Sequence, residues 1–203
     1  MKLRKLALLP AAAAAIAFGT PAIANSLTFQ GVTFDTQALD SDTLQLSILN
    51  ATSATGDWTG VGFLKAFELK DIGSVSGATV VSAPAGTTWA VNVENGLAAN
   101  TLGCGTGGTG GACFFTTPPA ALTDSMIWTI DFTGTNLDFG APHLKVQFMT
   151  GVNDTQKTGN LLSQTIPAIP EPETYAMMLA GLGLLGFVAR RRRQGLGGNL
   201  VPA

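Results

Sequence analysis

Two cysteines carry the most definite chemistry in this sequence. Cys104 and Cys113 are the only cysteines of the chain, and they enclose a run of glycine, threonine and alanine. In an oxidising compartment two such thiols form a disulfide by default, and the glycines make closure of the loop sterically easy. A metal site would need further ligands nearby, and none is evident in the sequence. We therefore predict a Cys104–Cys113 disulfide, with no metal and no other cofactor.

The other residues capable of catalysis form weaker patterns. His143 is the sole histidine and stands beside Pro142 at the start of an expected strand, where a structural or exposed role is usual. No serine lies in a nucleophile elbow, so a catalytic triad has no support. Asp40, Asp42 and Asp57 fall in expected turns without the spacing of a calcium loop. The separation of any carboxylate pair is a property of the fold, so a glycoside hydrolase stays among the alternatives.

Three tryptophans are the candidates for contact with a ligand ring. Trp89 and Trp128 alternate with aliphatic residues, which places them in the expected core. Trp58 lies among glycine, aspartate and threonine, so it is the candidate for a partly exposed ring that stacks on a sugar. The alternative for Trp58 is burial in the core, because aromatic side chains bury strongly.

Period-two alternation of apolar and polar residues recurs through the middle of the chain and defines the elements that position these side chains. Such alternation is typical of strands with one buried and one solvated face. About eight short strands separated by polar turns predict an antiparallel β-sandwich or jelly roll over residues 25–164. The clearest segments are Leu44–Ile48, Val61–Leu69, Trp89–Val93, Met126–Phe132 and Leu144–Phe148, with weaker ones at Leu27–Phe34, Thr79–Ala83 and Cys113–Thr116.

The amino-terminal residues 1–24 have the pattern of a secretory signal peptide. A basic start is followed by an apolar run and by Ala22-Ile23-Ala24, an A-x-A cleavage pattern. We predict that signal peptidase cuts between Ala24 and Asn25. The alternative is a permanent amino-terminal anchor, against which the short apolar run and the small residues at the site argue.

Charge separates the exported part from the two ends of the chain. Between residues 25 and 170 four lysines stand against eleven acidic residues, so this part has a net charge near −7, whereas the whole chain has −2. An acidic domain does not bind nucleic acid or anionic lipid non-specifically. Nucleic acid is therefore not an expected partner.

The carboxyl-terminal part divides into three segments. Residues 165–174 form a proline-rich spacer, for which we predict extended geometry. Tyr175–Ala189 is an uncharged apolar run. As a helix it would be roughly 22 Å long, which with snorkelling arginines approaches the roughly 30 Å of a hydrocarbon core. We predict a transmembrane helix here, followed by an arginine cluster and a cytoplasmic tail at residues 190–203.

The order of these features resembles a known signal. Pro170-Glu171-Pro172, the Gly- and Leu-rich run Leu179–Gly186 and the cluster Arg190-Arg191-Arg192-Arg193 resemble the PEP-CTERM sorting signal of Gram-negative bacteria. The resemblance covers about an eighth of the chain. It implies recognition by an exosortase, a membrane-embedded cysteine transpeptidase whose hosts usually also make exopolysaccharide.

These observations predict an exported protein that begins as a precursor anchored in the inner membrane with its domain in the periplasm. After processing it is expected at the cell surface or outside the cell. We expect a non-enzymatic role in association with the surface or an exopolysaccharide matrix. The alternatives are a carbohydrate-binding β-sandwich module and, with less support, an extracellular hydrolase, because a sandwich fold alone does not imply function.

Overall fold

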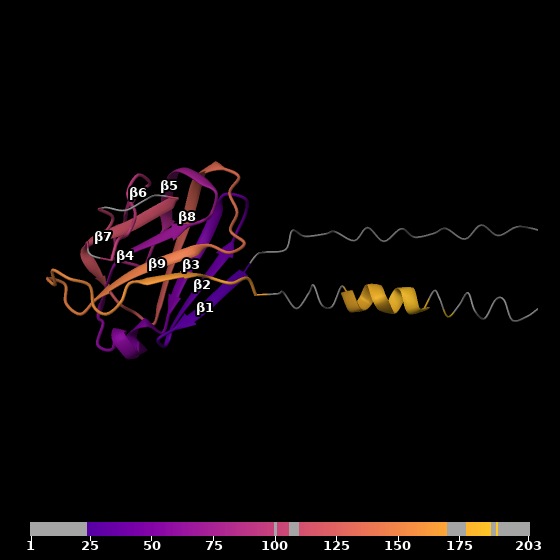
Figure 1. Cartoon of the computed structure of the whole chain (residues 1–203), viewed down its shortest axis with the longest axis horizontal. Coiled ribbons are helices and arrows are strands. Elements are labelled where there is room, and N and C mark those ends of the chain that lie inside the picture. The colour runs from indigo at the N-terminus through magenta and orange to yellow at the C-terminus, as the bar shows by residue number, and fades with distance from the viewer. Residues whose placement is uncertain (1–23, 100, 106–109, 170–177, 188–189, 191–203) are drawn as a thin grey trace, which may run out of the picture.

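The computed structural model describes residues 24–99, 101–105, 110–169, 178–187 and 190 (Figure 1). Within these residues the strands form two five-stranded antiparallel sheets that pack face to face. The predicted antiparallel β-sandwich is confirmed. Four predicted features lie wholly or partly outside the described residues: the signal peptide (1–23), the Pro-Glu-Pro segment and start of the membrane helix (170–177), the end of that helix (188–189), and the arginine cluster and tail (191–203).

The first sheet, called sheet A here, has the strand order β1-β2-β3-β8-β5. Its three leading strands form a meander, and the turn between the first two consists of Gln30 and Gly31, both with positive φ. Two consecutive positive φ angles are the signature of a type I′ turn, which suits the twist of a tight hairpin. The strands are β1 (Ala24–Phe29), β2 (Val32–Ala38), β3 (Thr43–Leu49), β5 (Ser74–Ser82) and β8 (Ser125–Thr135).

The second sheet, called sheet B, has the strand order β10-β9-β4-β7-β6. In β4 the pairing register shifts between Leu64 and Ala66, which marks a β-bulge. Lys65 interrupts the apolar alternation at this same point because the bulge changes which residues face the core. The strands are β4 (Phe63–Lys70), β6 (Ala90–Asn92), β7 (Gly111–Ala121), β9 (His143–Met149) and β10 (Leu162–Thr165).

The core lies between the sheets and follows the predicted alternation. In β3 the residues Leu44, Leu46 and Ile48 are fully buried, and their neighbours along the strand are half-buried. Trp89 and Trp128 are buried and contact each other edge to face, 5.3 Å between ring centroids. Their predicted place in the core is confirmed. Two 3₁₀-helices within the described residues, Ala51–Ser53 and Gly56–Trp58, connect β3 to β4.

The end of the domain lies beyond the predicted boundary at residue 164. β10 ends at Thr165, and the next residue, Ile166, is fully buried in the core. Residues 167–169 then pair with β1 of sheet A. The first part of the predicted spacer is therefore packed structure, because its apolar residues have core and strand-edge positions to occupy.

Residues 178–187 and residue 190 are helical, and the apolar side chains of this helix are exposed. Residues 178–187 lie inside the predicted transmembrane segment Tyr175–Ala189, whose residues 175–177 and 188–189 lie outside the described residues, and residue 190 begins the predicted arginine cluster. Among the residues that the structure describes, no helix is both long and apolar enough to span a membrane.

Candidate functional site

The two ends of the sandwich domain lie side by side at one edge of the sandwich (Figure 1). Asn25 in β1 forms an antiparallel bridge with Ala168. The backbone N–H of Ser26 donates to the carbonyl oxygen of Pro167 at 3.3 Å, and the N–H of Ile169 donates to that of Ala24 at 3.0 Å. Residues 24–26 and 167–169 are called the paired ends below. Their backbone pairing places the predicted signal-peptidase site next to the start of the sorting segment.

Asn25 fixes the amino-terminal half of the paired ends. Its side chain is 1% exposed, and its Nδ2 donates to Thr36 Oγ1 at 3.1 Å and to the carbonyl oxygen of Phe139 at 2.8 Å. These bonds tie β1 to β2 and to the loop before β9. The residue predicted to begin the mature chain is therefore a structural part of the sandwich.

A depression of about 390 Å³ lies beside the paired ends on the outer face of sheet A, with serine, glutamine and aspartate residues in its lining. The strand registers place Ser26, Asp35 and Ser47 in one row across three strands, and Gln37 beside Gln45 in the next. Asp35 Oδ1 is buried and has no hydrogen-bond partner among the described residues. The depression therefore offers hydroxyl, amide and carboxylate groups to a polar ligand.

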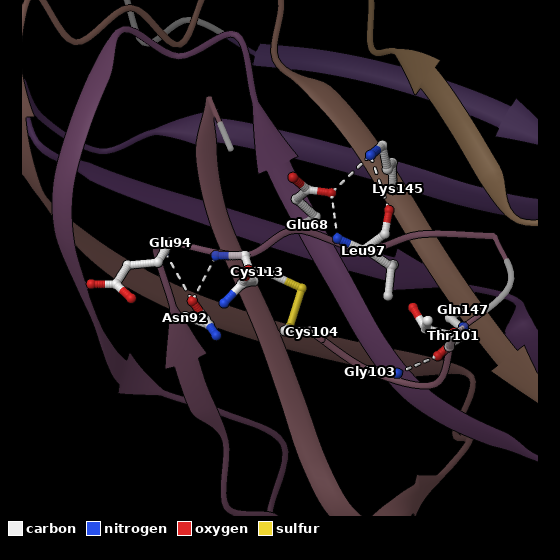
Figure 2. Close-up of a disulfide and its surroundings, with 11 residues drawn as sticks. Glu68, Asn92, Glu94, Leu97, Thr101, Gly103, Cys104, Cys113, Lys145 and Gln147 are labelled. Carbon is white, nitrogen blue, oxygen red and sulfur yellow. Dashed lines mark hydrogen bonds and ion pairs between the residues drawn. A yellow bond between two sulfur atoms is a disulfide. The ribbon is translucent and has the colours of Figure 1, made fainter. Parts of the chain in front are cut away.

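On the outer face of sheet B, residues 93–99 and 101–105 of the connection between β6 and β7 pack over strands β4 and β9 (Figure 2). Beneath this loop Glu68 is 1% exposed, and its Oε2 lies 3.0 Å from Lys145 Nζ and accepts the N–H of Leu97 at 2.8 Å. Lys145 Nζ also donates to the carbonyl oxygen of Leu97 at 3.0 Å. An ion pair between a buried carboxylate and a lysine that is 18% exposed thus holds both the N–H and the carbonyl group of one loop residue.

The same loop has two further attachments (Figure 2). Gln147 Oε1 accepts the N–H of Gly103 at 2.9 Å, and its Nε2 donates to the carbonyl oxygen of Thr101 at 2.7 Å. Cys104 and Cys113 form a disulfide with a Cα–Cα distance of 5.7 Å, as the sequence predicts. Cys113 is 1% exposed and packs with Ala66 and Leu97 in a small second core. The disulfide therefore fastens the loop to a packed surface.

The predicted turn acids and the histidine have local partners. Asp40 Oδ1 accepts the N–H groups of Asp42 and Thr43, and the bond from Asp42 is the main reason why the pKa of Asp40 falls to about 2. Asp57 accepts a hydrogen bond from Asn160 Nδ2 at 2.8 Å. Within the described residues no cluster of three or more His, Cys, Asp or Glu side chains is arranged to hold a metal ion.

His143 is the first residue of β9 and lies between β10 and β4 in sheet B. Its Nε2 lies 2.9 Å from Ser163 Oγ, and its Nδ1 lies 3.3 Å from Thr165 Oγ1, both on β10. Partial burial lowers the pKa of His143, which keeps the ring neutral at neutral pH. The histidine therefore links two strands through hydroxyl groups.

The proposed exposure of Trp58 is wrong. Trp58 is fully buried, contacts Phe29, Phe34 and Phe148 edge to face, and donates from Nε1 to the carbonyl oxygen of Asn160 at 2.9 Å. The short 3₁₀-helix Gly56–Trp58 turns the indole inward while its polar neighbours remain exposed. No sugar ring can reach this indole in the folded domain.

Comparison with known proteins bears on the carboxyl-terminal segment. Residues 168–193 match the family model of the PEP-CTERM protein-sorting motif. No curated protein and no solved structure matches the chain. The predicted resemblance is confirmed: the chain carries a PEP-CTERM sorting motif, which implies an exported protein sorted to the membrane or cell surface. In particular, the motif implies processing by an exosortase, and it begins inside the paired ends, at Ala168.

Proposed function

We propose that this protein is a non-enzymatic component of the cell surface or of an exopolysaccharide matrix, delivered there through its sorting motif. The observation that carries the proposal is the match of residues 168–193 to that motif. The fold adds support, because the motif begins at the edge where both ends of the sandwich meet.

The buried charged and polar groups of sheet B support a structural role. Glu68, Lys145 and Gln147 are all used to hold the loop between β6 and β7 against the sheet. Such groups would be free to act on a substrate only if the loop left the sheet. A domain stabilised in this way suits long residence outside the cell, with a disulfide in addition.

Mass spectrometry of the mature protein tests the processing on which the proposal depends. We expect a first residue of Asn25 and a carboxyl terminus between residues 170 and 174, with the arginine cluster removed. In a host without exosortase the arginine cluster should remain. Glu171→Ala should accumulate membrane-bound precursor, whereas Glu173→Ala, two residues away, is the matched control. A mature protein from an exosortase-containing host that still has its arginines contradicts the proposal.

Carbohydrate binding is the second candidate, and the depression on sheet A is the observation that favours it. Its serines, glutamines and Asp35 match the hydrogen-bonding needs of sugar hydroxyls. Co-sedimentation of the purified protein with the host's own polysaccharide tests this candidate. Binding in the depression is supported if Gln45→Ala lowers the retained fraction of protein and Gln156→Ala does not. Gln156 is an exposed glutamine outside the depression. Shortening of the polymer would show a hydrolase. If the protein neither binds nor shortens the polymer, the structural role remains.

A further inference from the structure

The predicted signal-peptidase site lies within paired secondary structure. β1 begins at Ala24, where Ala24 pairs with Gln37 and Asn25 pairs with Thr36. The side chain of Asn25 is buried and holds two further hydrogen bonds. A peptidase must take the backbone around the bond it cuts into its own site, so paired backbone is cut only when the strand opens. The Ala24–Asn25 bond is thus accessible before β1 joins the sheet and protected afterwards.

Whether the Ala24–Asn25 peptide bond is intact also decides whether a hydrogen bond at the other end of the domain has its acceptor. Ile169, the last described residue before the Pro-Glu-Pro sequence, donates its N–H to the carbonyl oxygen of Ala24. Hydrolysis of the Ala24–Asn25 bond adds water, leaves a carboxylate on Ala24 and an ammonium group on Asn25, and releases Ala24 with the signal peptide. The N–H of Ile169 then loses its acceptor. The bond from Ser26 to Pro167, longer at 3.3 Å, stays with the mature chain.

We propose that the two processing events are coupled through the paired ends, so that removal of the signal peptide promotes cleavage at the sorting motif. This inference depends on the exosortase processing proposed above. In the precursor, Ile169 is held on β1, directly before the segment that an exosortase must bind. Once Ala24 has left, residues 168 and 169 separate from β1 more easily, and the motif has more free chain in front of it. A backbone hydrogen bond of this kind changes the opening equilibrium by about three- to tenfold.

The test follows sorting cleavage of the full chain in its host by pulse-chase. Ala22→Leu, a bulky residue in the A-x-A pattern, blocks the first cut. We expect sorting cleavage of this blocked chain to be about three- to tenfold slower than that of the wild type. Adding Ile169→Pro, which removes the N–H donor, should restore the rate. Adding Ala168→Pro is the matched control: it places a proline at the neighbouring position while leaving the Ile169 donor in place, and it should not restore the rate.

Hydrogen exchange gives a second measurement that does not need the second cut. The blocked precursor and the Glu171→Ala chain, which has lost only its signal peptide, are compared in detergent. The Ile169 amide should exchange about three- to tenfold more slowly in the blocked precursor. Equal cleavage rates for wild type and blocked chain, equal effects of the two prolines, or equal exchange would overturn the coupling. A wild-type chain that is never cut at the motif instead overturns the proposed processing itself.

Discussion

The buried ion pair beneath the loop of sheet B gives a quantitative prediction. Lys145→Met keeps the apolar stem of the side chain but removes the ammonium group that lies 3.0 Å from Glu68 Oε2. Glu68 is 1% exposed, so its carboxylate would remain buried with the N–H of Leu97 as its described partner. Breaking a buried pair in this way costs about 3–5 kcal/mol. We expect a loss of that size in the free energy of unfolding.

Urea unfolding of the oxidised exported protein measures this loss. Fluorescence reports the transition, because Trp58, Trp89 and Trp128 are all buried in the folded state. The double variant Glu68→Gln/Lys145→Met removes both charges, so it should be more stable than Lys145→Met alone. Lys157→Met is the control, since the Lys157 ammonium group makes an exposed bond to the Gly159 carbonyl; it should change stability by less than about 0.5 kcal/mol.

Two results would refute this reasoning. A loss below about 1 kcal/mol for Lys145→Met would mean that water reaches Glu68 and solvates its charge, as for an exposed pair. If the double variant is less stable than Lys145→Met, the Glu68 carboxylate still has a compensating partner in the single variant. Either result would remove the ion pair as the main attachment of the loop.

Three further predictions concern other parts of the domain. Alkylation of the unreduced protein should modify neither Cys104 nor Cys113, and Cys104→Ser/Cys113→Ser should lower stability by at most roughly 2–3 kcal/mol while the sandwich stays folded; two reactive thiols in the native protein would disprove the bridge. Trp58→Ala should cost about 3–5 kcal/mol in urea unfolding because it empties a core site between three phenylalanines, whereas a variant as stable as wild type would contradict the burial of this indole. The folded-state pKa of Asp40, about 2, lies below the ordinary 3.8, so its contribution to stability is present above pH ~4 and is lost as the pH falls through about 2; carboxyl NMR titration should show the low pKa in the wild type, and an ordinary value would contradict the two backbone bonds.

The sandwich was predictable because a strand with one buried face has apolar and polar residues in alternation along its sequence. Leu44, Leu46 and Ile48 alternate with polar residues, and β3 indeed alternates in burial. The same logic fails at β4, where the bulge after Leu64 shifts the inward positions to Phe67 and Leu69. In the sequence the bulge is visible only as an interruption of the apolar alternation at Lys65. The spacing does not reveal that a bulge causes the interruption.

The covered face of sheet B was not predictable from alternation. Glu68 and Lys145 each stand at an outward position of a strand, where charge indicates contact with water. Glu68 is buried and Lys145 is mostly covered because a loop distant in sequence packs over them. Trp58 was misjudged for a similar reason: its glycine and aspartate neighbours indicate a loop, whereas contacts with Phe29 and Phe148 on distant strands decide its burial. Local pattern carries no information on such long-range contacts.

The meeting of the two ends at one edge also makes the domain a unit that can be re-cut and transplanted. Closely spaced termini at a surface are the condition under which circular permutation and domain insertion are tolerated. A short glycine linker from Ile169 to Asn25, with new ends opened at the exposed residue Asn153, would keep both sheets and the disulfide. Carrying the sorting motif on those new ends would turn the sandwich relative to the membrane, and would thereby separate the effect of its orientation from that of its composition.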